Sequence, residues 1–336
     1  MYREIVFGKI RDKCQELLTR LKKKELSLVL AVSGGLDSSA LLHAFSEVSK
    51  VQKNIKISVA HVNHKLRPTS DADQNFVQDR TSHYGLDFFT VNLAAKDQGR
   101  STEEWAREKR YQFLESVRLN QAADLVVTAH NLNDQAETLL SRLLTGRLLT
   151  QAGCIAEYDQ ERKLFRPALD LSRTELSAYC SELEIPFVED PSNQDQYYLR
   201  NFIRHELLTL IRNKINPQVD SALSEFVARM HADEALINSY SDEILAKIPS
   251  VNALKRSDLL ALPKALQWRV LRDQMISQSK LNQNKHHSVL KVGYSAWVRA
   301  SEWLASSGPT KPGAVIELGH GTSLSVGNAD DLVICS

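Results

Sequence analysis

Short apolar runs alternate with longer amphipathic stretches over the first part of the chain. The runs predict strands at residues 26–32, 55–61, 87–93 and 125–129, and the stretches predict helices at 38–49, 71–84, 102–122 and 133–144. Leu28 to Val32 is apolar without a break, which is typical of a parallel strand buried on both faces. The alternation predicts an α/β fold with a doubly wound, mostly parallel sheet.

The pattern changes after residue 145. A polar turn cluster lies at residues 189–193, and helical periodicity then continues to about residue 307. Glycine-punctuated alternation near the end predicts a small terminal sheet. We therefore expect an α/β domain at residues 1–215, a helical domain at 216–310, and a small β tail at 311–336 packed on the helical domain.

Charge and composition narrow the function classes. The chain has 42 Lys plus Arg and 41 Asp plus Glu, so its net charge of +1 gives no overall attraction to nucleic acid, and any basic surface must be local. Residues 1–20 predict an amphipathic helix without the apolar run of a secretory signal, and no apolar run is long enough for a membrane span. We therefore expect a cytoplasmic protein with no membrane partner.

The segment Ser33-Gly34-Gly35-Leu36-Asp37-Ser38-Ser39 lies between the most apolar strand and a predicted helix. Adjacent glycines let the backbone approach an anion, and the helix start adds amide groups and the positive end of the helix dipole. A simple strand-to-helix turn capped by Ser or Asp is the alternative. The phosphate cradle that we expect is made by Ser33, Gly34, Gly35, Leu36 and Ser38.

The loop differs from two common phosphate-binding motifs. No Gly-Lys-Ser/Thr follows it, as a Walker A motif requires, and it lacks the Gly-x-Gly-x-x-Gly spacing of dinucleotide-binding folds. A carboxylate inside an anion-binding loop would repel phosphate unless a cation bridges the two. Asp37 therefore predicts a bound Mg²⁺, with Asp37 as a metal ligand.

Ser-Gly-Gly-x-Asp-Ser resembles the loop of the PP-loop ATP pyrophosphatases, which cleave ATP between its α and β phosphates and adenylate a carbonyl oxygen. Further blocks, which together span about residues 28–210, resemble the motifs of the tRNA(Ile)-lysidine synthetases within that superfamily. These blocks are His61-Val62-Asn63-His64-Lys65-Leu66-Arg67, Glu104-Trp105-Ala106-Arg107 with Arg110-Tyr111, residues 129–138, and residues 166–193 with Arg200-Asn201-Phe202-Ile203-Arg204.

The resemblance implies the substrates and cofactors. These would be ATP, Mg²⁺, free L-lysine and a tRNA(Ile) with the anticodon CAU. Lysine would be ligated to C2 of the wobble cytidine through an adenylated tRNA intermediate, with release of AMP and pyrophosphate. The helical domain would then contact tRNA, while the oligomeric state stays open, a homodimer included.

The resemblance and the residue chemistry together give candidate catalytic residues. Asp134 and Glu137, three apart at a predicted helix start, would hold the lysine ammonium, although acids in a first helical turn also complement the helix dipole. His130 ends the fourth predicted strand, at the carboxyl edge where open α/β sheets bind ligands. Asp37, Asp134, Glu137 and His130 form the expected catalytic set.

Further basic residues are candidates for binding. His61 and Arg107 would contact ATP, with packing and solvation as the respective alternatives. Arg200 and Arg204, four apart on one helix face, would clamp tRNA phosphates, and Arg67 would be a third tRNA contact. The alternative for the two clamp arginines is an ion pair with a nearby acid, Glu206 or Asp195.

Two features depart from the resembling family. That family usually has two acidic residues before the Gln of its fourth motif, whereas this chain has Asn133 and Asp134 before Gln135. The loop that follows is usually rich in glycine, but residues 145–153 here are not. A second acidic contact to metal or lysine is therefore not assured, nor is the closure of that loop.

Two other functions compete with this one. A tRNA thiolase with the same loop would need a persulfide or cluster cysteine, but the four cysteines lie far apart and form no Cys-x-x-Cys pair, which favours buried thiols. They are Cys14, Cys154, Cys180 and Cys335. The second competitor is a non-catalytic tRNA or nucleotide sensor, against which the presence of Asp37, Ser38 and Asp134 argues.

Overall fold

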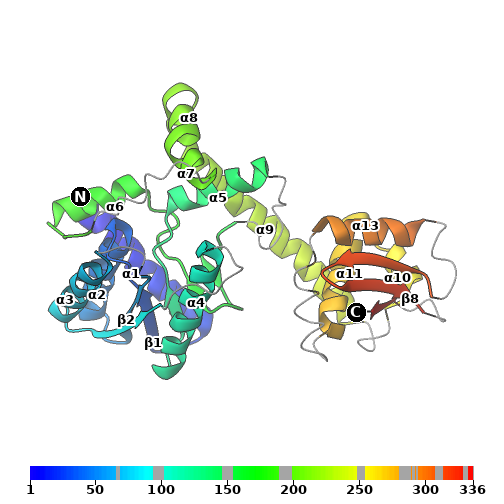
Figure 1. Ribbon diagram of the computed structural model, residues 1–336, viewed down its shortest axis with the longest axis horizontal. Coiled ribbons are helices and arrows are strands. Elements are labelled where there is room, and N and C mark those ends of the chain that lie inside the picture. The colour runs from blue at the N-terminus through cyan, green and yellow to red at the C-terminus, as the bar shows by residue number, and fades with distance from the viewer. Residues whose placement is uncertain are drawn as a thin grey trace. The chain divides into compact units, whose positions relative to one another are not determined.

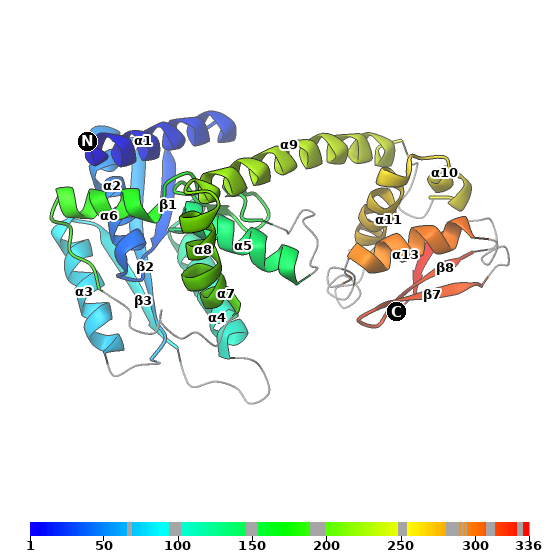
Figure 2. The same ribbon diagram turned by 90° about the horizontal axis from the view of Figure 1, so that it is seen from above.

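A computed structural model describes residues 1–65, 69–93, 102–145, 154–188, 199–247, 254–279, 289, 292, 294–306, 313–327 and 332–335 (Figures 1 and 2). The chain divides into two compact units, Met1–Phe226 and Val227–Ser336. The division falls within a single long helix, α9 (Val219–Leu245).

The first unit is built on a six-stranded sheet of order β3-β2-β1-β4-β6-β5. Every neighbouring pair is parallel except β5 with β6, which confirms the predicted doubly wound, mostly parallel sheet. The strand order reverses at β1, and ligands of open α/β sheets bind at the carboxyl edge beside such a reversal. The strands are β1 (Leu26–Ala31), β2 (Ile55–Asn63), β3 (Asp87–Asn92), β4 (Leu125–Val127), β5 (Tyr158–Asp159) and β6 (Leu164–Phe165).

Helices cover both faces of this sheet (Figure 2). Leu28 and Leu30 of β1 belong to the core that includes Phe45 of α2, whereas Val29 packs with Leu114 of α4 on the opposite face. Alternate residues of β1 are thus buried on opposite sides, which explains why this strand is apolar without a break. The helices are α1 (Tyr2–Leu21), α2 (Leu36–Val51), α3 (Ser70–His83), α4 (Thr102–Asn120), α5 (Leu132–Leu144) and α6 (Arg173–Glu182).

A further helical run packs against α5. α7 (Leu199–Phe202) continues through a π-helical turn (Ile203–Leu207) into α8 (Leu208–Lys214). Ile203 and Leu208 are buried in a small core with Ala136 of α5 and Val219 of α9. This core holds the arginine-bearing turns of the run against the first part of α5.

The second unit combines helices with a small sheet. Trp268 of α11 and Trp297 of α13 share one core with Leu318 and Leu324 of the sheet, so the predicted terminal sheet is confirmed and packs with the helices. Within the described residues, no helix is long and apolar enough to cross a membrane. The elements are α10 (Arg256–Leu260), α11 (Lys264–Ser279), α13 (Tyr294–Ala305), β7 (Val315–Gly319), β8 (Thr322–Val326) and β9 (Leu332–Cys335).

Candidate active site

The loop after β1 turns into α2 because Gly34 adopts a backbone conformation that residues with side chains rarely take. Its φ is +94°, and a Cβ at this position would lie 3.2 Å from Cγ2 of Val77. Gly35 follows as the N-cap of α2, in an extended conformation. The N–H of Val188 donates to the carbonyl oxygen of Gly34 at 2.9 Å and holds the turn from its other side. The path of the loop therefore depends on glycine at position 34.

The loop amides point at hydroxyl oxygens. The N–H groups of Ser33 and Gly34 both donate to Oγ of Ser38, each at 3.2 Å. The N–H of Gly35 donates to Oγ of Ser33 at 3.4 Å. These hydrogen bonds are long, and phosphate oxygens would be stronger acceptors at a helix N-terminus. The loop thus has the donors that the predicted phosphate cradle requires.

Replacing Gly34 by alanine is expected to weaken ATP binding and lower the melting temperature. The new methyl group would meet Val77, and a φ of +94° is strained for alanine by about 1 kcal/mol or more, which corresponds to a fall of roughly 2–4 °C. Calorimetric titration with ATP should show a loss of about tenfold or more in affinity. Gly8→Ala is the matched control, because nothing lies within 4 Å of the added carbon there. Unchanged ATP affinity in Gly34→Ala would contradict a role in phosphate binding.

Asp37 carries a buried oxygen that lacks a partner. Oδ1 of this carboxylate has no hydrogen bond within the described structure, while Oδ2 lies 3.8 Å from Nη1 of Arg173. Burial raises the pKa of Asp37, and the nearby Asp134 acts in the same direction, whereas the positive charge of Arg173 and a hydrogen bond with the Asn131 side chain lower it. Leaving a buried carboxylate oxygen unpaired is costly unless a cation or donor binds there. Asp37 therefore fits the predicted role of a Mg²⁺ ligand.

The start of α5 holds the two other acids. Asn131 is the N-cap, and its Oδ1 accepts from the N–H of Asp134 at 3.1 Å, while Oδ2 of Asp134 accepts from the N–H of Asn131 at 3.0 Å. This reciprocal pair is a capping box, so Asp134 does complement the helix start. Its second oxygen, Oδ1, remains for other partners. Glu137 lies one turn further on, with its side chain only 1% exposed.

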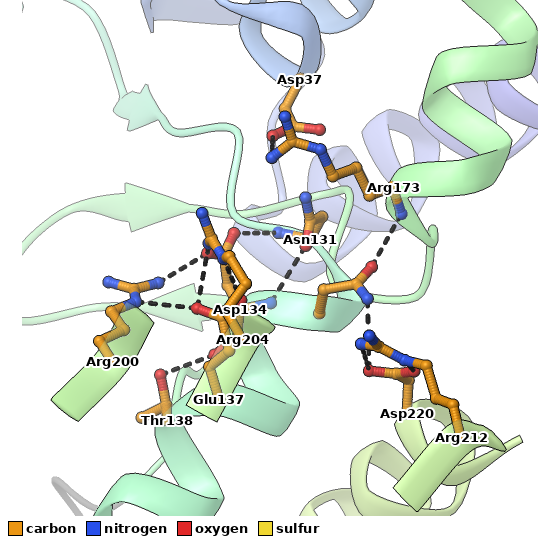
Figure 3. Close-up of polar contacts among 11 residues, drawn as sticks. Asp37, Asn131, Asp134, Glu137, Thr138, Arg173, Arg200, Arg204, Arg212 and Asp220 are labelled. Atoms are coloured by element: carbon orange, nitrogen blue, oxygen red, sulfur yellow. Dashed lines mark hydrogen bonds and ion pairs between the residues drawn. The ribbon is translucent and has the colours of Figure 1, made fainter. Parts of the chain in front are cut away.

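Arg200 and Arg204 bind these same two acids (Figure 3). Nε of Arg200 donates to Oε2 of Glu137 at 2.9 Å, and its Nη2 donates to Oδ1 of Asp134 at 2.6 Å. Nε of Arg204 donates to Oε1 of Glu137 at 2.5 Å, and its Nη2 donates to Oε2 of the same acid at 3.0 Å. The predicted lysine pocket and the predicted phosphate clamp are therefore one network of two positive and two negative charges.

Glu206, one of the two acids that the sequence suggested as partners of these arginines, is not their partner in the described structure. Within the described residues, neither Arg200 nor Arg204 forms an ion pair with Glu206, and Asp195 lies outside those residues. The arginines sit on a helical run whose apolar side packs against α5, so they meet acids that are distant in sequence.

His130 follows β4 at the carboxyl edge of the sheet, and its Nδ1 lies 2.8 Å from Oγ1 of Thr128. Burial lowers the pKa of His130 to about 3, and the positive charges of Arg166, Arg200 and Arg110 act in the same direction. The imidazole is therefore neutral near pH 7 and is a weak base, so it can take part in hydrogen bonds but is poorly suited to accept a proton. The surrounding guanidinium groups are suited to anionic ligands.

Acidification is expected to destabilise the fold through His130. A histidine in the unfolded chain has a pKa of about 6.5, whereas that of folded His130 is about 3. Between these values the unfolded state binds the extra proton, so stability falls as the pH is lowered from about 6.5. Denaturant unfolding should show a smaller loss between pH 7 and pH 5 in His130→Gln. A titration midpoint near 6.5 in the imidazole NMR signals of His130 would contradict this expectation.

The other candidate residues differ in their surroundings. His61 is 4% exposed, and its Nδ1 donates to the carbonyl oxygen of Val32 at 2.8 Å. This hydrogen bond holds the residue that directly precedes the phosphate loop. Arg107 is exposed and lies over the ring of Tyr111, 5.4 Å from its centroid. Arg67 lies outside the described residues. The contacts of these three residues with ATP or tRNA stay predictions.

Sequence reasoning missed Arg173 as a site residue. It is the first residue of α6, after the N-cap Ser172, whose side chain forms a capping box with Glu175. The Ser-x-x-Glu spacing predicts this helix start, but no local pattern indicates that the Arg173 side chain extends to Asp37.

Comparisons with known proteins show which family the chain belongs to. A family profile described as PP-loop domain matches residues 8–211. A tRNA(Ile)-lysidine synthase from Gloeobacter violaceus is 34% identical over 251 residues, which cover 73% of this chain and 75% of that protein. The chain belongs to the tRNA(Ile)-lysidine synthase family. Lysidine synthases from Thermus thermophilus and Thermotoga sp. (strain RQ2) are 37% and 36% identical over 77% and 61% of this chain. The chain spans about half the length of these two relatives, at 50% and 49%.

Membership of the lysidine synthase family confirms the resemblance, and its PP-loop domain implies ATP binding. A solved structure titled U34-tRNA thiolase NcsA from Methanococcus maripaludis with its [4Fe-4S] cluster has a TM-score of 0.58 over 68% of this chain and 79% of its own, at 16% identity. That likeness shows a shared fold alone. Within the described residues, Cys14, Cys154 and Cys180 are buried, and no group of three His, Cys, Asp or Glu could hold a metal. The thiolase alternative therefore gains no support from these residues.

Proposed function

We propose that this chain ligates free L-lysine to C2 of the wobble cytidine in the CAU anticodon of tRNA(Ile). The reaction runs through an adenylated tRNA and releases AMP and pyrophosphate. The observation that carries the proposal is that a phosphate-loop carboxylate, Asp37, lies near the acidic pair Asp134 and Glu137, which arginines face (Figure 3). Relatives named tRNA(Ile)-lysidine synthase support it.

The first step must activate the base. The C2 carbonyl of cytosine has no leaving group, so an amine cannot displace its oxygen directly. Attack of that oxygen on the α-phosphate of ATP forms a new P–O bond, breaks the α–β anhydride bond and releases pyrophosphate. The amides of Ser33, Gly34 and Gly35 would orient the phosphates for this attack.

We assign Oδ1 of Asp37 as a Mg²⁺ ligand. Magnesium that binds with a nucleotide usually takes one or two carboxylates together with phosphate oxygens, so a single buried oxygen without a partner is sufficient. The ion would supply charge neutralisation for the departing pyrophosphate. Arg173, beside the other oxygen of Asp37, adds positive charge on the same side.

The second step needs lysine to be held as a cation at one end and to be deprotonated to a free amine at the other. The free amine then attacks C2, a C–N bond forms, and the adenylated oxygen leaves with AMP. Glu137 and Asp134 are the proposed partners of the ammonium, which would replace a guanidinium in the network. We propose that Arg200 moves aside, because its side chain is 47% exposed whereas that of Glu137 is 1% exposed. The same carboxylates are suited to accept the proton that the attacking amine loses, whereas the low pKa of His130 makes its imidazole a weak base.

The decisive experiment is lysine-dependent release of AMP and pyrophosphate by the full chain. It should occur with ATP, Mg²⁺ and an unmodified tRNA(Ile) transcript, and the product should contain lysine. A transcript with uridine in place of the wobble cytidine is the matched control and should give no product. A folded protein that binds ATP and tRNA but releases no lysine-dependent pyrophosphate would be a non-catalytic relative, and lysine-independent sulfur transfer would indicate a thiolase.

The proposed tRNA contacts of Arg200 and Arg204 give a salt-dependent prediction. Their hydrogen bonds to the described acids use Nε and Nη2, which leaves Nη1 of each to reach a phosphate. Arg200→Ala and Arg204→Ala should each lower the log–log salt slope of tRNA binding by roughly one unit. Filter binding at several salt concentrations measures this slope. An unchanged slope with weaker lysine or ATP binding would place the arginines on the small-substrate side.

A further inference from the structure

Asn133 uses both ends of its side-chain amide to join three helix starts. Its Oδ1 accepts from the backbone N–H of Arg173 at 2.9 Å, and its Nδ2 donates to Oδ1 of Asp220 at 3.3 Å. Asp220 is held in turn by Arg212, whose Nε and Nη2 donate to its two oxygens at 2.7 and 2.8 Å. Asn133 thus connects the beginnings of α5, α6 and α9.

The position requires an amide because of Asp220. An aspartate at 133 could still accept from the N–H of Arg173, but it would place a second carboxylate at about the 3.3 Å distance that Asn133 now keeps from Asp220. Two like charges that close repel strongly when partly buried. Asp220 cannot easily turn away, because its side chain is 13% exposed and bound at both oxygens by Arg212. The departure from the family pattern at this residue therefore has a physical reason in this chain.

The same amide fixes the backbone from which a site side chain extends. The first N–H groups of a helix have no partner within the helix, and Asn133 supplies the acceptor for that of Arg173. Nη1 of Arg173 lies 3.8 Å from Oδ2 of Asp37. A displacement of the first turn of α6 would therefore move this positive charge relative to the phosphate loop.

We propose that Asn133 is a positioning residue of the nucleotide site, which holds the start of α6 so that Arg173 faces Asp37 and contacts the phosphates of bound ATP. The inference rests on the proposed ATP–Mg²⁺ site. Arg173 is the residue that touches the nucleotide, and Asn133 acts through it. Because Arg212 holds the Asp220 carboxylate in place, the side chain at position 133 must be an uncharged hydrogen-bond donor.

Loss of the Asn133 contacts should displace α6 locally and leave it folded. The N–H of Leu132 donates to the carbonyl oxygen of Leu171 at 2.9 Å, which ties the start of α5 to the segment before α6. The N–H of Glu175 donates to Oγ of Ser172 at 3.1 Å and preserves the helix cap. Neither bond involves Asn133, so ATP affinity and stability can be separated by experiment.

The test is a charge exchange between positions 133 and 220. Asn133→Asp should weaken binding of ATP with Mg²⁺ about fivefold or more and raise the KM for ATP, with a smaller change in kcat. The double variant Asn133→Asp with Asp220→Asn should recover part of the lost affinity, because it removes the repulsion between two carboxylates. Recovery should be incomplete, since the amide nitrogen introduced at position 220, which donates to the carboxylate introduced at position 133, cannot accept from Nη2 of Arg212. Asn216→Asp is the matched control, since Asn216 acts there as the acceptor for the N–H of Gln218 at 2.9 Å and aspartate can do the same. Calorimetric titration with ATP and Mg²⁺ in the absence of tRNA measures the affinity. It is carried out below the melting temperature of every variant.

Three results would overturn the inference. The first is equal ATP affinity in wild type and Asn133→Asp, and the second is a loss that the double variant does not relieve. The third is a lower melting temperature of Asn133→Asp with unchanged ATP binding, which would show a purely structural role. Lysine-dependent AMP formation by the wild-type chain in the same preparation would leave the proposed function standing in each case.

Discussion

Asp37→Ala is expected to abolish formation of adenylated tRNA while the protein stays folded. The substitution removes the buried carboxylate oxygen that has no partner in the described structure and leaves the glycines of the loop in place. Losing the ligand of the ion that neutralises the leaving pyrophosphate should slow AMP transfer by about a hundredfold or more. Single-turnover transfer of radiolabelled AMP from α-labelled ATP to tRNA measures this step without the contribution of lysine.

The same variant should not lose stability. Burial raises the pKa of Asp37, so the ionised carboxylate is less stable in the folded than in the unfolded chain, and near neutral pH it costs folding free energy. The melting temperature of Asp37→Ala should therefore equal or exceed that of wild type. Asp12→Ala is the matched control, because that side chain is 63% exposed, and it should change neither property. Near-normal AMP transfer by folded Asp37→Ala would refute the metal-ligand assignment.

The fold was predictable because its signals are local. An unbroken apolar run predicts a strand buried on both faces, and β1 is buried in this way, with Leu28 and Val29 in different cores. Two adjacent glycines after that strand predict the turn into α2. Strand lengths were harder to predict. β4 ends at Val127 and not at residue 129, and it pairs with β1 over only three residue pairs. The partner strand on its other side, β6, has only two residues, so pairing and not composition limits β4.

The site was predictable residue by residue but not as a set of contacts. Arg200 lies 63 residues from Glu137 in sequence, and no spacing rule connects them. Their meeting depends on Ile203, which packs against Ala136 and so turns the arginines towards α5. The approach of Arg173 to Asp37 likewise depends on where α6 begins relative to α2. The spacing of Asp134 and Glu137 predicts that they lie on one helix face, whereas tertiary packing decides which positive side chains contact them.

Asp134→Asn or Glu137→Gln is expected to impair the lysine step more than the adenylation step. Each change removes one negative charge from the pair of acids that faces Arg200 and Arg204. An incoming lysine ammonium would therefore lose one of its two carboxylate partners. The lysine concentration needed for turnover should rise by about tenfold or more, equivalent to about 1.4 kcal/mol or more of lost ion pairing. Adenylated tRNA should accumulate, because the phosphate loop and Asp37 are unchanged. Rapid-quench separation of adenylated from lysine-modified tRNA, at several lysine concentrations, measures both steps.

The network itself supplies the control for this last prediction. Glu137→Gln should also lower stability by about 1–3 kcal/mol, because two partly exposed guanidinium groups lose the buried carboxylate that they share. Kinetics must therefore be measured well below the melting temperature. Glu175→Gln is matched to Asp134→Asn, since both acids hold the same place in a capping box, but only Asp134 faces the arginines. The Glu175 variant should lose a little stability and keep the wild-type lysine requirement. If Asp134→Asn and Glu137→Gln both keep it as well, the lysine pocket lies elsewhere, and the four charges serve to hold α7 and the π-helical turn against α5.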